Sequence, residues 1–148
     1  MGRVWRRPST NVGRLLRKTR RELRLTQEEA AKRAGYTRQH YSKLEAGTCL
    51  LPIDGVWSVS GALLIEEALL MRAADVVVHS SVYPEPFGRV VVEAMLAGTP
   101  VIASRSGGVP EIVTHGETGW LVPPGDATAL AAAIGAVLDD PSRASAVA

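Results

Sequence analysis

The stretch PEPFGRVVVEAMLAGTPVIAS, residues 84–104, contains a loop, a short helix and a strand in that order. Two prolines and Gly88 predict the loop, residues 90–96 are predicted to be helical, and Gly98 closes the helix. The β-branched run 100–104 predicts a buried strand. A loop that delivers the chain to a helix N-terminus offers free amides and a positive dipole end, which together favour a bound phosphate group.

The sequence on either side of this stretch continues the alternation of strands and helices. Residues 74–80 form a β-branched run that predicts a strand before the loop, and 119–122 predict a third strand. The turn 123–126 then supplies an N-cap for a helix over 127–138. Alternating strands and helices predict an α/β unit with a parallel sheet.

The motifs of this region resemble those of a known enzyme family. EPFGRVVVEAM followed by AGTPVIA, then GGVPE, HGETGWLV and PGD, all occur in the order of the E-x7-E retaining glycosyltransferases. Enzymes of that family have two Rossmann-like domains, the GT-B fold. The run covers some 65 residues in the family's order, so the resemblance implies shared ancestry. A lone pair of glutamates eight residues apart would carry almost no such weight.

The resemblance implies roles for individual residues. Glu85 would hold hydroxyls of a donor sugar and is the candidate catalytic group, and Glu93 would hold the ribose hydroxyls. Amides near Gly88 would bind the diphosphate of a UDP- or GDP-linked sugar, and no other cofactor is expected. The alternative for Glu93 is an ordinary exposed helix glutamate. The expected nucleotide-sugar contacts are Glu85, Phe87, Gly88, Arg89, Val90 and Glu93.

The N-terminal half has a helical pattern from Val12 to about Met71. Thr26 begins a capping box for a helix that stops at Gly35. Thr37 can cap the next helix, over 38–46. Two short helices joined by a tight turn that contains glycine are typical of a helix-turn-helix.

The stretch LTQEEAAKRAGYTRQHYSKLEAG, residues 25–47, resembles the Cro/repressor type of helix-turn-helix domain. Residues 51–57 and 61–70 resemble the fourth and fifth helices of that family. The resemblance implies binding to double-stranded DNA, with homodimers common in the family. Tyr41 and Leu44 are expected in the core. A recognition helix places its N-terminal side chains at base edges. The DNA contacts that the resemblance implies are Gln27, Thr37, Arg38, Gln39, His40, Ser42 and Lys43, of which Gln27 and Lys43 would meet phosphate.

Charge divides the chain in the same way. Residues 1–50 hold 13 Lys and Arg against four acids, whereas 51–148 hold four Arg against 11 acids. The basic half suits nucleic acid, although a solvated surface would also explain it. A single cysteine, Cys49, excludes an internal disulfide. We expect no metal site, no membrane span, no signal peptide and a cytoplasmic location.

These patterns predict a five-helix all-α DNA-binding domain over 1–72, followed by a partial Rossmann-like parallel α/β unit over 73–148. The second unit is expected to be truncated, without an acceptor domain, and therefore inactive alone. Three alternatives remain open. The glycosyltransferase region could act with missing parts supplied in trans, nucleotide-sugar binding could regulate DNA binding, or the fusion could be non-functional.

Overall fold

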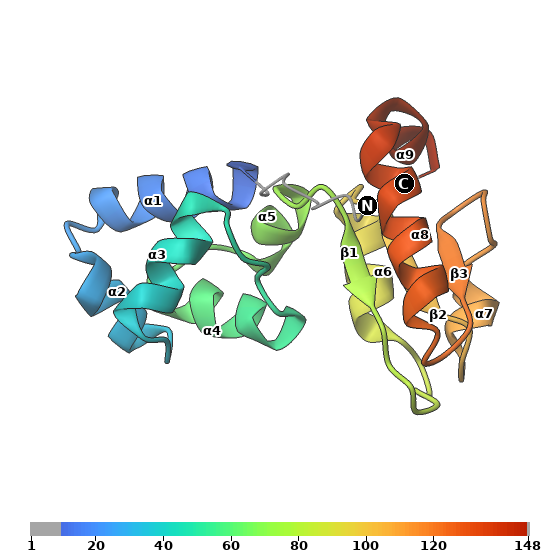
Figure 1. Ribbon diagram of the computed structural model, residues 1–148. Helices are drawn as coiled ribbons and strands as arrows, with labels where there is room; N and C mark the ends of the chain where they lie inside the picture. The colour runs from blue at the N-terminus through green and yellow to red at the C-terminus, as the bar shows by residue number, and fades with distance from the viewer. Residues whose placement is uncertain (1–9, 148) are drawn as a thin grey trace. The chain divides into compact units, whose positions relative to one another are not determined.

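A computed structural model describes residues 10–147 and divides the chain into two compact units, Met1–Ala74 and Asp75–Ala148 (Figure 1). The first unit is helical and the second contains a parallel sheet with helices, as the sequence predicts. Each unit is described by itself below. No helix within residues 10–147 combines the length and the apolar character needed to cross a membrane.

The described part of the first unit contains five helices, α1 to α5. The third helix packs against both α1 and α2, and α4 packs against α2 and α5. Tyr41, Leu16, Leu63 and Leu70 are among its fully buried side chains. The bounds are α1 Thr10–Glu22, α2 Gln27–Arg33, α3 Arg38–Ala46, α4 Ile53–Leu63 and α5 Glu67–Arg72.

The predicted caps of the helix-turn-helix are confirmed. Thr26 accepts a hydrogen bond from the Glu29 amide at 3.2 Å, and the Glu29 carboxylate accepts one from the Thr26 amide at 2.8 Å. The Thr37 hydroxyl likewise accepts from the His40 amide at 3.2 Å. These local bonds satisfy helix N-termini that would otherwise leave amides without partners.

The helix expected over 61–70 is wrong as a single element. Leu64 has φ +55° and ends α4, and α5 begins only at Glu67. The Ile65 amide donates to the Ser60 carbonyl at 3.1 Å, and the Ser60 hydroxyl donates to the Ile65 carbonyl at 2.5 Å. This paired contact closes the end of α4 through a left-handed residue, without the glycine that usually occupies it.

The second unit is a three-stranded parallel sheet in the order β1-β2-β3, with helices on it. All four residues of the central strand, β2, are buried. In Figure 1, α8 lies in front of this sheet and α6 behind it. Ile102 and Val122 pack with Val137 of α8 and Ala144 of α9. The bounds are β1 Val77–His79, α6 Arg89–Leu96, β2 Val101–Ser104, α7 Val109–Ile112, β3 Trp120–Val122, α8 Ala127–Asp139 and α9 Pro141–Val147.

The first strand is shorter than the sequence indicates, three residues instead of the expected run 74–80. Its neighbour β2 is also short, and pairing between the two covers Val77 to His79. The residues that follow turn away into the loop that leads to α6. His79 therefore stands at the carboxyl end of β1, where the strands of a parallel sheet place ligand-binding groups.

Candidate functional site

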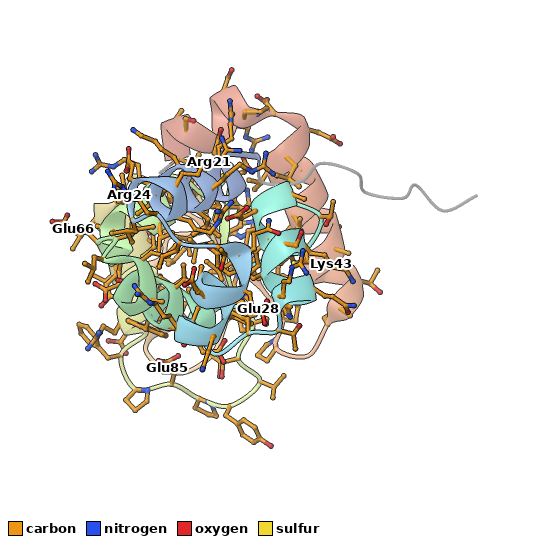
Figure 2. All side chains as sticks on the ribbon, turned by 90° about the vertical axis from the view of Figure 1, so that its left-hand side faces the viewer. Arg21, Arg24, Glu28, Lys43, Glu66 and Glu85 are labelled. Atoms are coloured by element: carbon orange, nitrogen blue, oxygen red, sulfur yellow. The ribbon has the colours of Figure 1, made fainter. Side chains whose placement is uncertain are left out.

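The third helix divides into a buried face and an exposed face. Tyr41 and Leu44 are 0% and 2% exposed, so their predicted place in the core is confirmed. Arg38, Gln39 and Lys43 are exposed. Figure 2 shows Lys43 on the outer side of α3. The helix therefore presents two long cations and one amide to solvent while its other face anchors it.

His40 and Ser42 are less open than the other predicted DNA contacts. Both are partly buried. The His40 ring lies against Tyr36, with 4.8 Å between ring centroids. Its Nε2 atom is buried and has no hydrogen-bond partner within residues 10–147. The Thr37 side chain is exposed and its hydroxyl caps α3. The His40 ring is therefore turned toward Tyr36 instead of lying free on the surface.

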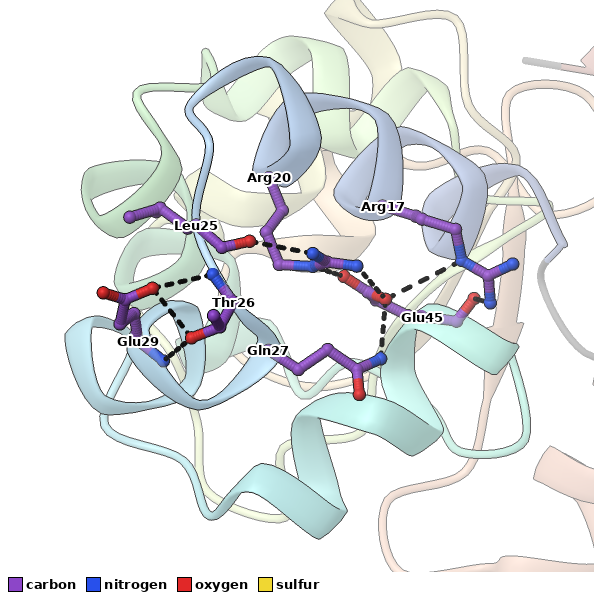
Figure 3. Close-up of polar contacts among 7 residues, drawn as sticks. All are labelled: Arg17, Arg20, Leu25, Thr26, Gln27, Glu29 and Glu45. Atoms are coloured by element: carbon purple, nitrogen blue, oxygen red, sulfur yellow. Dashed lines mark hydrogen bonds and ion pairs between the residues drawn. The ribbon is translucent and has the colours of Figure 1, made fainter.

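A buried carboxylate joins the three helices of this unit that surround the turn (Figure 3). The Glu45 side chain is 0% exposed. It accepts hydrogen bonds from Arg20 Nε at 2.5 Å and Nη2 at 3.1 Å, and from Gln27 Nε2 at 2.9 Å. Arg17 Nε lies 3.7 Å from the same carboxylate. A fork of two parallel bonds is the strong form of an Arg–carboxylate pair.

This network sets the charge state of Glu45. Burial alone would raise the pKa of Glu45, but hydrogen bonds from Arg20 and Gln27, with the charges of Arg20 and Arg17, lower it below its ordinary value. Burial raises the pKa of the neighbouring Tyr41 to about 12, with the Glu45 charge acting in the same direction. The carboxylate is thus ionised and the phenol neutral near pH 7. Sequence reasoning missed this network because its partners lie 18 to 28 residues apart.

The structure gives Gln27 an internal partner in addition to its predicted role. Its side-chain amide nitrogen donates to Glu45, while its oxygen points away from that carboxylate (Figure 3). The phosphate contact predicted for Gln27 stays a prediction. On α1, Arg14 donates to Asn11 Oδ1 at 2.5 Å, and Lys18 Nζ lies 3.9 Å from Glu22 Oε1.

In the second unit, residues 80–88 deliver the chain to α6. Gly88 has φ +66° and precedes the helix without any side-chain cap. A Cβ at Gly88 would lie 3.1 Å from Val109 Cγ2, so the turn is close to α7. The side chain of Val90 is buried, which leaves its amide as its only contribution to a ligand. Phe87, by contrast, is 65% exposed.

The two glutamates of the motif each have a basic neighbour. Arg89 Nε donates to Glu93 Oε1 at 2.7 Å, four residues apart on α6, while Glu93 Oε2 is buried with no hydrogen-bond partner among the described residues. The Glu85 carboxylate contacts His79 Nε2. One oxygen of Glu93 is thus paired with Arg89 and the other is buried without a partner, so the ribose contact predicted for Glu93 stays a prediction.

The second unit also contains a histidine whose contact is structural. His115 Nδ1 accepts a hydrogen bond from the Leu121 amide at 3.0 Å and thereby supports the start of β3. Within residues 10–147 there is no cluster of three or more His, Cys, Asp or Glu side chains that could hold a metal ion.

The family matches follow the same division. Residues 11–57 match the family described as "Helix-turn-helix domain", and residues 65–148 match "Glycosyl transferases group 1". The second match begins before α5, yet α5 packs on α4 of the first unit and Leu70 and Met71 are buried there. One helix is therefore glycosyltransferase by sequence and part of the helical unit by packing.

Curated proteins and solved structures of glycosyltransferases are similar to part of this chain. The chain is 49% identical to glycogen synthase of Mycobacterium tuberculosis over 75 residues, which is 51% of this chain and 18% of that protein. It is 49% identical to phosphatidyl-myo-inositol mannosyltransferase of Mycobacterium leprae over 72 residues, 49% of this chain and 19% of that protein. The structure of Anabaena HepE in complex with UDP-glucose matches at 36% identity and a TM-score of 0.53, covering 64% of this chain and 29% of that one.

The chain thus spans less than a fifth of the length of these two curated relatives. The TM-score of the HepE match shows a similar fold over the part of the chain that it covers. The order of motifs, the parallel sheet and these matches all indicate the same family. The chain belongs to the glycosyl transferases group 1 family through residues 65–148, homologous to GT-B glycosyltransferases, and carries a helix-turn-helix domain at residues 11–57.

Proposed function

We propose that the N-terminal unit binds double-stranded DNA with α3 in the major groove. The observation that carries the proposal is the division of α3 into a buried face and an exposed cationic face, on a helix-turn-helix domain. The Glu45 network supports it because it ties α3 to α1 and α2, so the exposed side chains stand on a rigid base.

The chemistry of the exposed face suits DNA. Arg38 can donate two bonds to guanine, and Gln39 can pair with adenine in the same bidentate way. Lys43 would neutralise phosphate. His40 and Ser42, on the same helix, would make further contacts with the DNA. Thr37 would contact the DNA in addition to capping α3. Each phosphate contact releases counterions, so binding should weaken steeply with salt. A second copy of the chain would supply the other half-site of a palindrome.

Replacing Arg38 by alanine is the direct test of this interface. We expect duplex affinity to fall by about 10- to 100-fold, since a bidentate base contact is worth roughly 1–3 kcal/mol. Fluorescence anisotropy of a labelled operator, selected first from a random duplex pool, measures it at two salt concentrations. Arg143→Ala, on α9 of the second unit, removes the same charge and should leave affinity within about twofold. Salt-independent or absent binding by the unaltered chain would contradict the proposal.

A second function is favoured by the family membership of the second unit. We propose that it binds a nucleotide-sugar, with the amides of Gly88, Arg89 and Val90 on the diphosphate, Glu93 on the ribose and Glu85 on the sugar. The solved relative, whose structure is a complex with UDP-glucose, supports the choice of ligand class. Transfer needs an acceptor side that closes over the donor, so we expect binding without turnover by this chain alone.

Calorimetric titration of the full chain with UDP-glucose, and separately with a GDP-linked sugar, tests donor binding. Measuring operator affinity with and without the ligand that binds then separates two alternatives. A shift in operator affinity supports a nucleotide-sugar-responsive regulator, because two linked sites must change each other's affinity. No shift leaves two independent activities, and no heat with either ligand contradicts donor binding. Turnover that appears only on adding a second protein would favour activity completed in trans.

A further inference from the structure

The backbone of Glu85 is held by a turn that lies far from it in sequence. The Gly108 amide donates to the Glu85 carbonyl at 3.0 Å. Gly107 has φ +58°, and a Cβ there would lie 2.6 Å from the Glu85 backbone nitrogen. Only glycine allows so close an approach of the two backbones. The main chain at Glu85 is therefore pressed against the segment that leads into α7.

The side chain of Glu85 is held from another direction. Its Oε2 atom contacts Nε2 of His79, the last residue of β1, whose side chain is 11% exposed. A carboxylate can only accept, so Nε2 must carry the hydrogen in this contact. His79 Nδ1 is buried with no partner among the described residues. Within residues 10–147, the one printed polar contact of this ring is therefore the contact of its Nε2 atom with Glu85.

The other oxygen of Glu85 is open. No other hydrogen bond or ion pair between described residues engages the carboxylate, which is 37% exposed. One oxygen is anchored and the second can accept a hydroxyl. This is the arrangement of a pre-oriented acceptor, in which the protein restricts the side chain before the ligand arrives.

We propose that His79 is a positioning residue that fixes the Glu85 carboxylate for the sugar part of a nucleotide-sugar, while the Gly107–Gly108 turn fixes its backbone. The proposal rests on the assignment of Glu85 to the donor sugar. It adds a residue outside the glutamate motif and predicts a selective effect. Loss of the His79 donor should weaken contacts to the sugar and leave contacts to the nucleoside diphosphate in place.

The ratio of UDP-glucose affinity to UDP affinity isolates the sugar contacts. Calorimetry on the full chain gives this ratio for the unaltered protein and for two variants of similar side-chain size. His79→Phe keeps a ring and removes the donor, and we expect the ratio to fall about tenfold, with UDP affinity changed by less than about twofold. His79→Gln keeps an N–H donor and should restore most of the ratio.

His115→Gln serves as the matched control, since it alters a second histidine of the same unit, one that accepts a hydrogen bond from the Leu121 amide. We expect it to change stability but not the ratio. A ratio unchanged in His79→Phe, or lowered equally in His79→Gln and His79→Phe, would overturn the proposal while leaving donor binding intact. If the unaltered chain binds neither ligand, the assignment of Glu85 fails, and the positioning role fails with it. If it binds UDP no less tightly than UDP-glucose, donor binding survives and the role of His79 is refuted.

Discussion

Replacing Glu45 by glutamine is expected to destabilise the helical unit by roughly 3 kcal/mol, because one member of a buried ion pair is removed and the other remains. The Arg20 side chain is 12% exposed and its guanidinium would keep its charge without the carboxylate beside it. Gln27 would lose its charged acceptor at the same time. Urea unfolding followed through the NMR amide signals of α3 measures the change in this unit alone.

Glu22→Gln is the matched control for this experiment. Its carboxylate pairs with Lys18 at 3.9 Å, and the two side chains are 60% and 74% exposed. Exposed pairs of this kind contribute little, so we expect a change below about 0.5 kcal/mol. Equal effects of the two substitutions would contradict a central structural role for Glu45.

The same network predicts how stability changes with pH. The pKa of Glu45 is lowered by its partners against the opposing effect of burial. Its contribution is therefore present above the ordinary glutamate pKa and lost as pH falls through the lower, folded-state value. Tyr41 behaves oppositely, because burial raises its pKa to about 12. Its contribution is present below the ordinary tyrosine pKa and lost as pH rises toward 12. In Glu45→Gln the acid-side loss should shrink.

Replacing Gly107 by alanine is expected to have the largest effect in the second unit. A methyl group would lie 2.6 Å from the Glu85 nitrogen, and a left-handed backbone is itself unfavourable for alanine. We expect a loss of about 2–4 kcal/mol, the sum of left-handed strain and overpacking. Urea unfolding followed through the amide signals of β2 reports the change.

Gly98→Ala separates the two causes. Gly98 has φ +69°, but nothing lies within 4 Å of a Cβ built there. It should therefore cost only the conformational part, about 1–2 kcal/mol. The difference between the two variants measures how tightly the turn approaches Glu85. If Gly107→Ala proves no worse than Gly98→Ala, the backbone contact with Glu85 does not constrain the loop.

Local signals made much of the fold predictable. Thr26 and Thr37 cap helices through hydrogen bonds only three residues along the chain, so their roles are visible in short windows. The same holds for the N-cap at Asp126, whose carboxylate accepts from the Ala129 amide at 2.8 Å. The end of α4 was not predictable in this way, because Leu64 takes the left-handed conformation that glycine usually marks.

The site depended on contacts that no short window contains. Glu45 and Arg20 are 25 residues apart, so no local pattern in the sequence pairs them. Gly13 has a related role that its helical context hides. A Cβ there would lie 2.6 Å from the Glu45 carbonyl oxygen, so this glycine lets α1 approach α3. The family motif located Glu85 and Glu93, whereas the contact with His79 required the folded sheet.

Hydrogen exchange of the full chain, followed by NMR, tests most directly that it holds two folded units with the loop of the proposed donor site in place. The central strand β2, Val101–Ser104, pairs on both sides and is buried, so its amides should exchange at least about 100-fold more slowly than in an unfolded chain. The Gly108 amide, bonded to Glu85, should also be protected. Protection confined to α1–α4, with β2 and Gly108 exchanging at unfolded rates, would contradict the account.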